Sequence, residues 1–290
     1  MSARTSIEWT DVTWNPIRGC SRVSEGCRNC YAERQAARWT GPGQPYDGLV
    51  SEGKWTGQIR LIWSALDLPL RWRKPRRVFV NSMSDLFHER LPDEIIGRIF
   101  DVMAMAEHHT FQVLTKRAAR MRDLLARWEA NPGDQPRRTS FSNIWLGVSV
   151  ENQATADKRI PLLLQTPAAV RWVSYEPALE SVNLWSFLAQ GSAVELRGLD
   201  WLVVGGESGP GARPFDVAWA RSTIAQGRAA GVPVFVKQLG ARPVYDLGDG
   251  HTYRMRAIRL RDRKGGKPEE WPEDLRVREA PQTYNRERSP

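Results

Sequence analysis

The chain has 290 residues, 41% of them hydrophobic, and a formal net charge of +9. It is long enough to bury a sizeable core in one large domain. No run of eighteen apolar residues occurs, so we expect no transmembrane helix, and residues 1–5 lack the apolar segment of a secretory signal. We therefore expect a cytoplasmic protein with no membrane partner.

The first predicted strand, Val12–Trp14, leads through a turn into the loop that holds every cysteine of the chain. These cysteines are Cys20, Cys27 and Cys30, and a helical run follows over Tyr31–Trp39. Three thiols at a strand-to-helix junction are well placed to bind a metal centre.

Several interpretations of these thiols are open. A disulfide would leave one thiol over in a chain without secretory features. Structural zinc suits the Cys27-x-x-Cys30 spacing but needs a fourth ligand, and no histidine lies nearby in the sequence. An iron–sulfur cluster with three thiolate ligands and one open iron needs no fourth cysteine, so the cysteine count favours it. Chance cysteines would be expected to scatter rather than cluster.

Residues 40–57 are rich in glycine and proline, which predicts a loop that serves as a lid or an insertion. Residues 61–73 then predict a short helix that stops near Pro75. From Arg77 onward, short apolar runs alternate with helical stretches.

The predicted strands after the cysteine loop are Arg77–Val80, Thr110–Leu114, Ile144–Val150, Val170–Val173, Leu199–Val204 and Val232–Val236. The predicted helices between them begin near Pro92, Ala118, residue 182 and Asp216, and Gly231 stops the last one. A further helix, between the strands at 144–150 and 170–173, carries Ile160, Leu163 and Leu164. The predicted helix that begins at residue 182 ends near residue 190.

Continuous apolar strands that alternate with amphipathic helices indicate a parallel sheet covered by helices. About seven strands favour an α/β fold of the (β/α) barrel type, closed like a TIM barrel or partial. We predict that residues 1–245 form this barrel domain with the cysteine loop. Residues 246–290 break the pattern and predict a polar C-terminal appendage with one hairpin.

Polar and small residues follow almost every predicted strand. Reactive residues of α/β barrels gather at these carboxyl ends, so the candidate ligand-binding residues are Asn81, Ser82, Asp85, Lys116, Arg117, Ser149, Glu151, Glu176, Gly205, Gly206, Glu207, Ser208 and Lys237. The alternative is an internal salt-bridge network that caps the barrel. The glycine turn at 205–206 would let backbone amides approach an anion. No residue is singled out as the catalytic hydrogen donor.

Two basic stretches indicate a polyanionic partner. One surrounds Trp72 and consists of Arg71, Arg73, Lys74, Arg76 and Arg77; the other consists of Lys116, Arg117, Arg120 and Arg122. Basic residues with interleaved aromatic rings suit a nucleic acid, because phosphates attract the charges and rings stack on bases. An arginine-rich solvated surface would have the same composition.

Several motifs together resemble the phage-associated three-cysteine family of uncharacterised proteins. They are Trp14-Asn15-Pro16, Gly19-Cys20, Gly26-Cys27, Cys30-Tyr31-Ala32-Glu33, Val80–Asp85, Leu114–Arg117, Trp145–Ser149, Ser174–Pro177, Gly205–Gly209 and Phe235–Gln238. The resemblance covers about Ile7 to Gly240. The family in turn resembles radical SAM enzymes, and its genes occur in phages and bacteria, often beside a three-Cys-motif partner protein.

The resemblance implies a 4Fe–4S cluster on the three cysteines and S-adenosylmethionine at the strand ends. It also implies an external electron donor and a 5′-deoxyadenosyl radical that modifies or repairs a nucleic acid or other large substrate. The chain departs from the radical SAM pattern in two ways. Six residues rather than three separate Cys20 from Cys27, and the Gly-Gly-Glu turn follows a late strand. Asn81, Ser82 and Asp85 occupy the early position instead. The alternative function is a non-catalytic barrel that binds nucleic acid or a partner and holds structural zinc.

Overall fold

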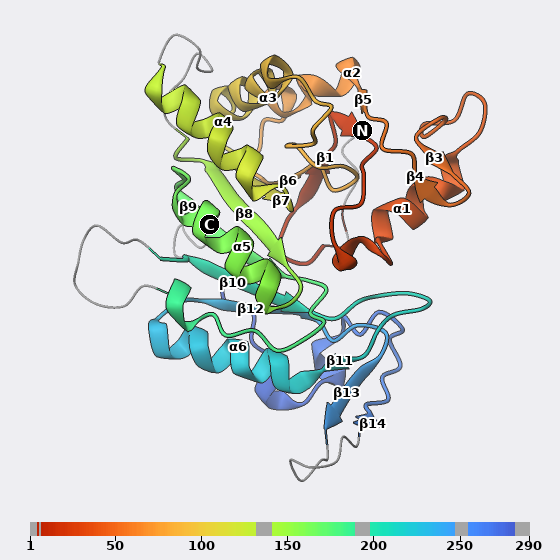
Figure 1. Cartoon of the computed structure of the whole chain (residues 1–290), viewed down its shortest axis with the longest axis vertical. Coiled ribbons are helices and arrows are strands. Elements are labelled where there is room, and N and C mark those ends of the chain that lie inside the picture. Colours follow the sequence, from red (N-terminus) through yellow and green to blue (C-terminus); the bar gives the residue numbers. More distant parts are fainter. Residues whose placement is uncertain (1–4, 6, 132–140, 189–197, 247–254, 282–290) are drawn as a thin grey trace. The chain divides into compact units, whose positions relative to one another are not determined.

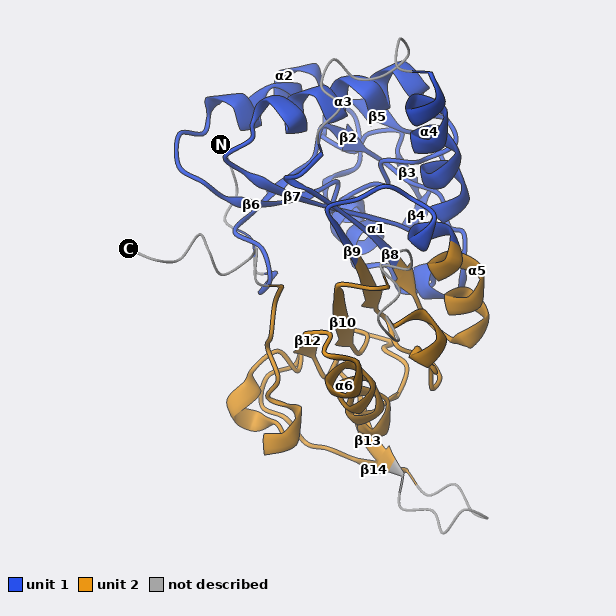
Figure 2. Cartoon of the chain, turned by 90° about the vertical axis from the view of Figure 1, so that its left-hand side faces the viewer, with its two compact units in different colours: residues 1–148, 162–171 blue, residues 149–161, 172–290 orange. Residues whose placement is uncertain are grey.

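A computed structural model of the chain describes residues 5, 7–131, 141–188, 198–246 and 255–281. Figure 1 shows the whole chain coloured along the sequence, and Figure 2 shows the two compact units into which it divides. Unit 1 comprises residues 1–148 and 162–171, and unit 2 comprises residues 149–161 and 172–290. In the part that the structure describes, no helix combines the length and apolar character needed to cross a membrane.

Seven strands form one sheet in the order β1-β6-β7-β8-β9-β10-β12. Their bounds are β1 Val12–Trp14, β6 Arg77–Val80, β7 Thr110–Thr115, β8 Ile144–Val150, β9 Val170–Tyr175, β10 Trp201–Gly205 and β12 Val234–Gln238. Pairing is parallel from β1 through β6 and β7 to β8, and again from β9 through β10 to β12. The sheet is open, since its order begins at β1 and ends at β12. The predicted α/β fold is confirmed in its partial-barrel form.

The strands are buried on both faces, which explains why they read as continuous apolar runs rather than alternating ones. All residues of β6, β8 and β10 are buried. Burial at about 25 cal/mol per Å² of apolar surface supplies the main stabilisation of such strands.

Four longer helices accompany the strands: α3 Asp93–Met105, α4 Ala118–Ala130, α5 Gln153–Leu164 and α6 Val217–Ala230. In unit 1, Phe100 of α3 packs edge-on against Trp128 of α4, with ring centroids 5.2 Å apart. In unit 2, α6 begins at the Asp216 cap and ends at Gly231, whose φ of 68° confirms the predicted stop. Gly227 lets α6 approach β12, because a side chain there would collide with Val234.

The segment after β1 forms a small subdomain around the cysteine loop. Strand β2 (Ile17–Arg18) pairs with β5 (Arg60–Leu61), and β3 (Val50–Ser51) forms a hairpin with β4 (Lys54–Trp55). The predicted loop at 40–57 therefore contains a hairpin. Helix α1 (Tyr31–Ala36) continues as a 3₁₀ turn, η2 (Ala37–Trp39). A small apolar cluster of Ala32, Ala36, Val50 and Met83 joins this helix to the hairpin and to the segment after β6.

Two predicted helices are wrong in the described residues. Residue 61 ends β5, and the rest of the segment forms a one-turn helix, α2 (Trp63–Leu66), and a 3₁₀ turn, η3 (Leu68–Arg71), because Pro69 lacks the amide proton that a continuous helix needs. Residues 182–188 contain only the short turn η5 (Trp185–Phe187), and residues 189 and 190 lie outside the described residues. Val182, Leu184 and Leu188 are buried, so the apolar residues of the second segment reflect burial, whereas Trp63 and Leu70 of the first segment are exposed.

The C-terminal part of unit 2 packs into its core. Strand β13 (Pro243–Asp246) pairs with β11 (Phe215–Asp216) and, in antiparallel orientation, with β14 (Met255–Ala257). The hairpin predicted within residues 246–290 is therefore not formed by those residues alone, because β13 begins at Pro243. The turns η6 (Pro268–Glu270) and η7 (Glu273–Leu275) follow, and Trp271 and Leu275 are buried. Arg278 bridges antiparallel to Phe235 and so covers an edge of β12. The compact units differ from the predicted division at residue 245, and that boundary between domains stays a prediction.

Acid should destabilise the protein through His109. This side chain is 1% exposed, its Nε2 lies 3.1 Å from the Pro69 carbonyl, and burial lowers its pKa to about 4. The native state therefore keeps His109 neutral between about pH 6.5 and 4, where the unfolded state takes up a proton. We expect unfolding free energy to fall by about 1–3 kcal/mol over this range. Urea unfolding of His109→Phe should give a shallower pH slope; an unchanged slope would contradict this assignment.

Candidate functional site

The three cysteines lie on the segment between β2 and α1. Cys20 follows Gly19, whose φ of 90° suits glycine and whose backbone bridges to Ser84; a side chain at position 19 would collide with the Gln58 carbonyl. Cys27 ends the turn η1 (Glu25–Cys27), and Cys30 is the cap residue of α1. All three thiols are free and half-buried.

Two basic residues act on these thiols. Burial raises the pKa of Cys20 to about 12; Asp85 adds to this rise, and Arg117 opposes it. Burial also raises the pKa of Cys30, and Lys116 opposes that rise. Cys27 contributes to both shifts. The thiols therefore sense one another's charge, and a metal would have to displace their protons.

The residues fit an iron–sulfur centre in donor chemistry and number. Three free thiols share one loop, and cations lie where they would stabilise thiolates. Among the described residues, no group of three or more histidine, cysteine, aspartate or glutamate side chains is already arranged to hold a metal ion. The loop would have to close around a bound metal centre.

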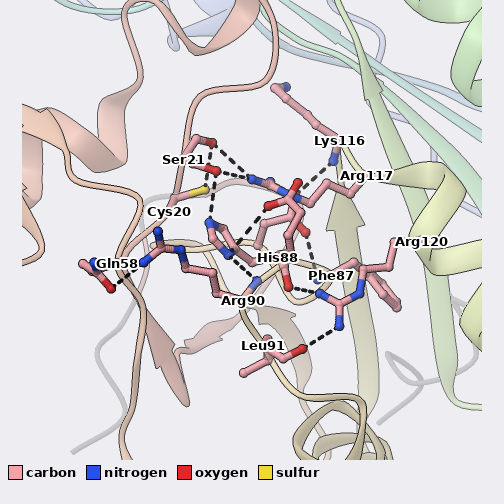
Figure 3. Close-up of polar contacts among 12 residues, drawn as sticks. Cys20, Ser21, Gln58, Phe87, His88, Arg90, Leu91, Lys116, Arg117 and Arg120 are labelled. Atoms are coloured by element: carbon pink, nitrogen blue, oxygen red, sulfur yellow. Dashed lines mark hydrogen bonds and ion pairs between the residues drawn. The ribbon is translucent and has the colours of Figure 1, made fainter.

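A buried ion pair ties the cysteine loop to the ends of β6 and β7 (Figure 3). Arg117 donates to Asp85 (2.9 Å), to Glu89 (2.7 Å) and to the Ser21 hydroxyl (2.7 Å). Arg117 is 8% exposed and Asp85 is 5% exposed. Burial alone would lower the pKa of Arg117, but Asp85 and Glu89 raise it, so the guanidinium stays charged.

The same aspartate organises the backbone at the strand ends. Asp85 accepts from the Thr115 hydroxyl at 2.7 Å and from the Lys116 amide at 3.2 Å. These contacts fix the turn that carries Lys116 and Arg117. Asp85 was predicted as a ligand contact. In the described residues it has a structural role instead, because it holds the turn after β7 in place.

A second ion pair closes the cysteine loop on itself. Arg22, between the first two cysteines, donates through two nitrogens to Glu33, which follows the third. Glu33 is 2% exposed and also accepts from the Trp55 amide at 2.7 Å. One buried carboxylate thus joins the loop, α1 and the β3–β4 hairpin.

Asn81 is unusual among the predicted site residues. It has a φ of 58° and is 3% exposed, and neither of its side-chain amide atoms has a hydrogen-bond partner among the described residues. A buried amide without partners costs stability, so Asn81 is a candidate for contact with a bound ligand. Ser82, next in the chain, donates to Asn15 at 3.1 Å.

In unit 2, each predicted glutamate has a basic partner. Arg159 donates to both oxygens of Glu151 at 3.1 and 3.0 Å. Lys237 lies 3.1 Å from Glu176, which also accepts from Ser174. Arg213 donates to both oxygens of Glu207. Each of these glutamates thus has its own partner, and a salt-bridge network that caps the barrel stays a prediction.

The glycine turn after β10 is tightly packed. A side chain at Gly205 would collide with Glu176, and one at Gly206 would collide with the Leu239 carbonyl. These glycines are therefore required by local packing, whatever they bind. Ser149 and Ser208 also belong to unit 2.

The predicted site residues thus fall into two groups. Unit 1 holds the cysteines with Asn81, Ser82, Asp85, Lys116 and Arg117, and unit 2 holds the remaining ones. A single cavity lined by both groups stays a prediction. Sequence reasoning missed Ser21, Glu33, His88, Arg159 and Arg213. The first two lie within the Cys20–Glu33 segment itself, which was the available signal.

The two basic stretches differ in how many of their side chains are paired with carboxylates. Arg117, Arg120 and Arg122 pair with Asp85, Asp93 and Asp123. In the stretch around Trp72, Arg77 is buried against Asp11 and Arg76 lies 5.2 Å from the Trp72 ring. Arg73 and Lys74 are exposed. The stretch around Trp72 is therefore the better candidate for contact with a polyanion.

A family described as a protein of unknown function, DUF5131, matches residues 4–271. The chain belongs to the DUF5131 family. Membership in an uncharacterised family agrees with the predicted resemblance. No curated protein matches this DUF5131 chain.

Solved structures of spore photoproduct lyase are similar to the DUF5131 chain. A variant with bound AdoMet and dinucleoside spore photoproduct has 10% identity and a TM-score of 0.38, covering 61% of this chain and 48% of that one. A second variant has 9% identity and a TM-score of 0.46, and the match covers 95% of this chain and 75% of that one. A complex with dinucleoside spore photoproduct has 11% identity and a TM-score of 0.44, and the match covers 88% of this chain and 71% of that one. The chain spans about half the length of the first of these.

Loss of Arg22 should loosen the cysteine loop. Arg22→Ala leaves the buried Glu33 carboxylate without its cation, and since Arg22 is itself partly exposed we expect a cost of about 1–3 kcal/mol. Chemical denaturation measures it. Arg28→Ala, at an exposed position of the same loop, is the matched control and should cost less than about 0.5 kcal/mol. Equal effects of the two changes would contradict the role of the ion pair.

Each cysteine should be needed for metal binding but not for folding. Cys20→Ala, Cys27→Ala and Cys30→Ala remove half-buried loop side chains rather than core ones. We expect near-complete loss of bound metal with an unchanged far-UV circular dichroism spectrum. Metal content of anaerobically reconstituted protein is the measurement. Full metal occupancy in any one variant would rule out that cysteine as a ligand.

Proposed function

We propose that the chain is a radical SAM-type enzyme that acts on a nucleic acid or another large substrate. The observation that carries the proposal is the cysteine loop with its flanking cations. Three free thiols share one loop, and burial raises the pKa of Cys20 and Cys30, while Arg117 opposes the rise at Cys20 and Lys116 opposes it at Cys30.

Ligand count favours a cluster over structural zinc. Three thiolates satisfy three irons of a 4Fe–4S cluster and leave one iron open, whereas a structural zinc site closes its shell with four protein ligands. His88 does not supply the fourth ligand in the described residues, because its ring nitrogens are engaged by Ser21 and by the Arg90 amide. When bound together, a reduced cluster and S-adenosylmethionine supply one-electron cleavage of the sulfonium and thus a 5′-deoxyadenosyl radical.

The chain's own residues would bind and orient the ligands. Cys20, Cys27 and Cys30 would hold the cluster. Asn81, whose amide is buried without a partner among the described residues, would accept or donate a hydrogen bond to S-adenosylmethionine.

The stretch around Trp72 supports a nucleic-acid substrate. Its exposed Arg73 and Lys74 would contact phosphates, and the net charge of +9 would steer a polyanion toward the protein. A three-Cys-motif partner protein and an external electron donor complete the proposed system. Modification or repair of the nucleic acid is the proposed outcome.

The decisive experiment combines metal analysis with a cleavage assay. We expect about four iron and four labile sulfide per chain after anaerobic reconstitution. With a strong reductant, chromatography should detect 5′-deoxyadenosine formed from S-adenosylmethionine, slowly when no substrate is present.

Two outcomes would overturn the proposal. Stoichiometric zinc without sulfide would favour a binding protein with a structural metal. Iron-loaded protein that neither binds S-adenosylmethionine nor forms 5′-deoxyadenosine, even with the partner protein and nucleic acid added, would exclude the enzymatic function. Cys27→Ala protein taken through the same reconstitution is the matched control.

A further inference from the structure

Ser21, directly after Cys20, belongs to the polar network drawn in Figure 3. Its hydroxyl oxygen is 2.7 Å from an Arg117 nitrogen and 3.0 Å from His88 Nε2. Its backbone carbonyl lies 3.3 Å from Arg117 and 3.5 Å from the Cys20 sulfur. The network thus converges on the residue next to the first cysteine.

The direction of each hydrogen bond follows from the donors. A guanidinium has only N–H groups, so Arg117 donates to the Ser21 oxygen. His88 Nδ1 accepts the Arg90 backbone N–H at 3.2 Å, so Nδ1 carries no proton. The proton of a neutral imidazole then sits on Nε2, and His88 also donates to Ser21.

His88 is held in this neutral form. It is 1% exposed, and both burial and the neighbouring Arg117 lower its pKa. Glu89 is the acidic group nearest the ring, and its carboxylate oxygen is 3.7 Å from Nδ1, too far for a hydrogen bond. The Arg90 amide therefore keeps Nδ1, which sets the tautomer.

Ser21 consequently receives two hydrogen bonds on one oxygen. A hydroxyl has two lone pairs and one proton, so both acceptor positions are filled and only the O–H remains to donate. No acceptor for this proton is present among the described residues. The side chain is half-buried beside Cys20, and the Arg117 charge that acts on Ser21 also acts on the Cys20 thiol.

We propose that the Ser21 hydroxyl is a committed hydrogen-bond donor to the sulfur of the metal centre held by Cys20, with His88 and Arg117 as the positioning residues that orient it. The inference rests on the proposed function, because it needs an iron–sulfur centre on the cysteine loop. A donor to sulfur stabilises the more negative, reduced state of such a centre and raises its reduction potential.

The test is a redox titration of reconstituted protein without S-adenosylmethionine, followed by electron paramagnetic resonance. Ser21→Ala should shift the reduction equilibrium about tenfold toward the oxidised centre, about 59 mV for a one-electron couple. Ser21→Thr keeps a hydroxyl and should retain the wild-type potential. Ser84→Ala is the matched control, since the Ser84 hydroxyl already donates to the Ile17 carbonyl at 3.0 Å.

A second measurement covers the case in which Ser21→Ala fails to assemble a centre. Electron-nuclear double resonance of the reduced wild-type and Ser21→Thr proteins in H₂O and D₂O should reveal an exchangeable proton coupled to the centre. An unchanged potential in Ser21→Ala, or no such coupling in the wild type, overturns the role of Ser21 and leaves the proposed function intact. Wild-type protein that assembles no iron–sulfur centre overturns both.

Discussion

The buried pair of Asp85 and Arg117 holds unit 1's candidate site together. A buried charge is costly unless it is paired and hydrogen-bonded. Asp85 meets this condition with Thr115, the Lys116 amide and Arg117, and Arg117 meets it with Asp85, Glu89 and Ser21. The ends of two parallel strands and the cysteine loop therefore share one electrostatic network, and none of these parts can shift alone without exposing an unpaired charge.

The same principle assigns different roles to residues of the same type. Several arginines that raise the net charge of the chain are bound to carboxylates: Arg77 to Asp11, Arg117 to Asp85 and Arg159 to Glu151. Such residues stabilise the fold and cannot also bind phosphate without breaking a buried pair. Net charge thus indicates a polyanionic partner only through its exposed part, and here Arg73 and Lys74 beside Trp72 carry that part.

Prediction from sequence succeeded where burial produces a regular pattern of apolar residues or a continuous apolar segment. The seven parallel strands read as continuous apolar segments because both faces of each strand are covered. It failed at residues 61–73, where Pro69 interrupts the helix, and at residues 182–188, where the buried side chains of Val182, Leu184 and Leu188 belong to irregular backbone. It also missed Arg213 and Arg159 as partners of Glu207 and Glu151, since a carboxylate does not reveal in the sequence which of many arginines will reach it.

The sequence by itself determined the α/β class, the strand ends that carry polar residues and the three-cysteine loop, because these depend on local periodicity and residue type. Only the tertiary structure decided how the polar residues pair. The Asp85–Arg117 and Arg22–Glu33 contacts, the neutral tautomer of His88 and the unpartnered amide of Asn81 depend on distances between segments far apart in the chain. Hydrogen bonds act over about 3 Å, so folding alone determines which donors and acceptors meet.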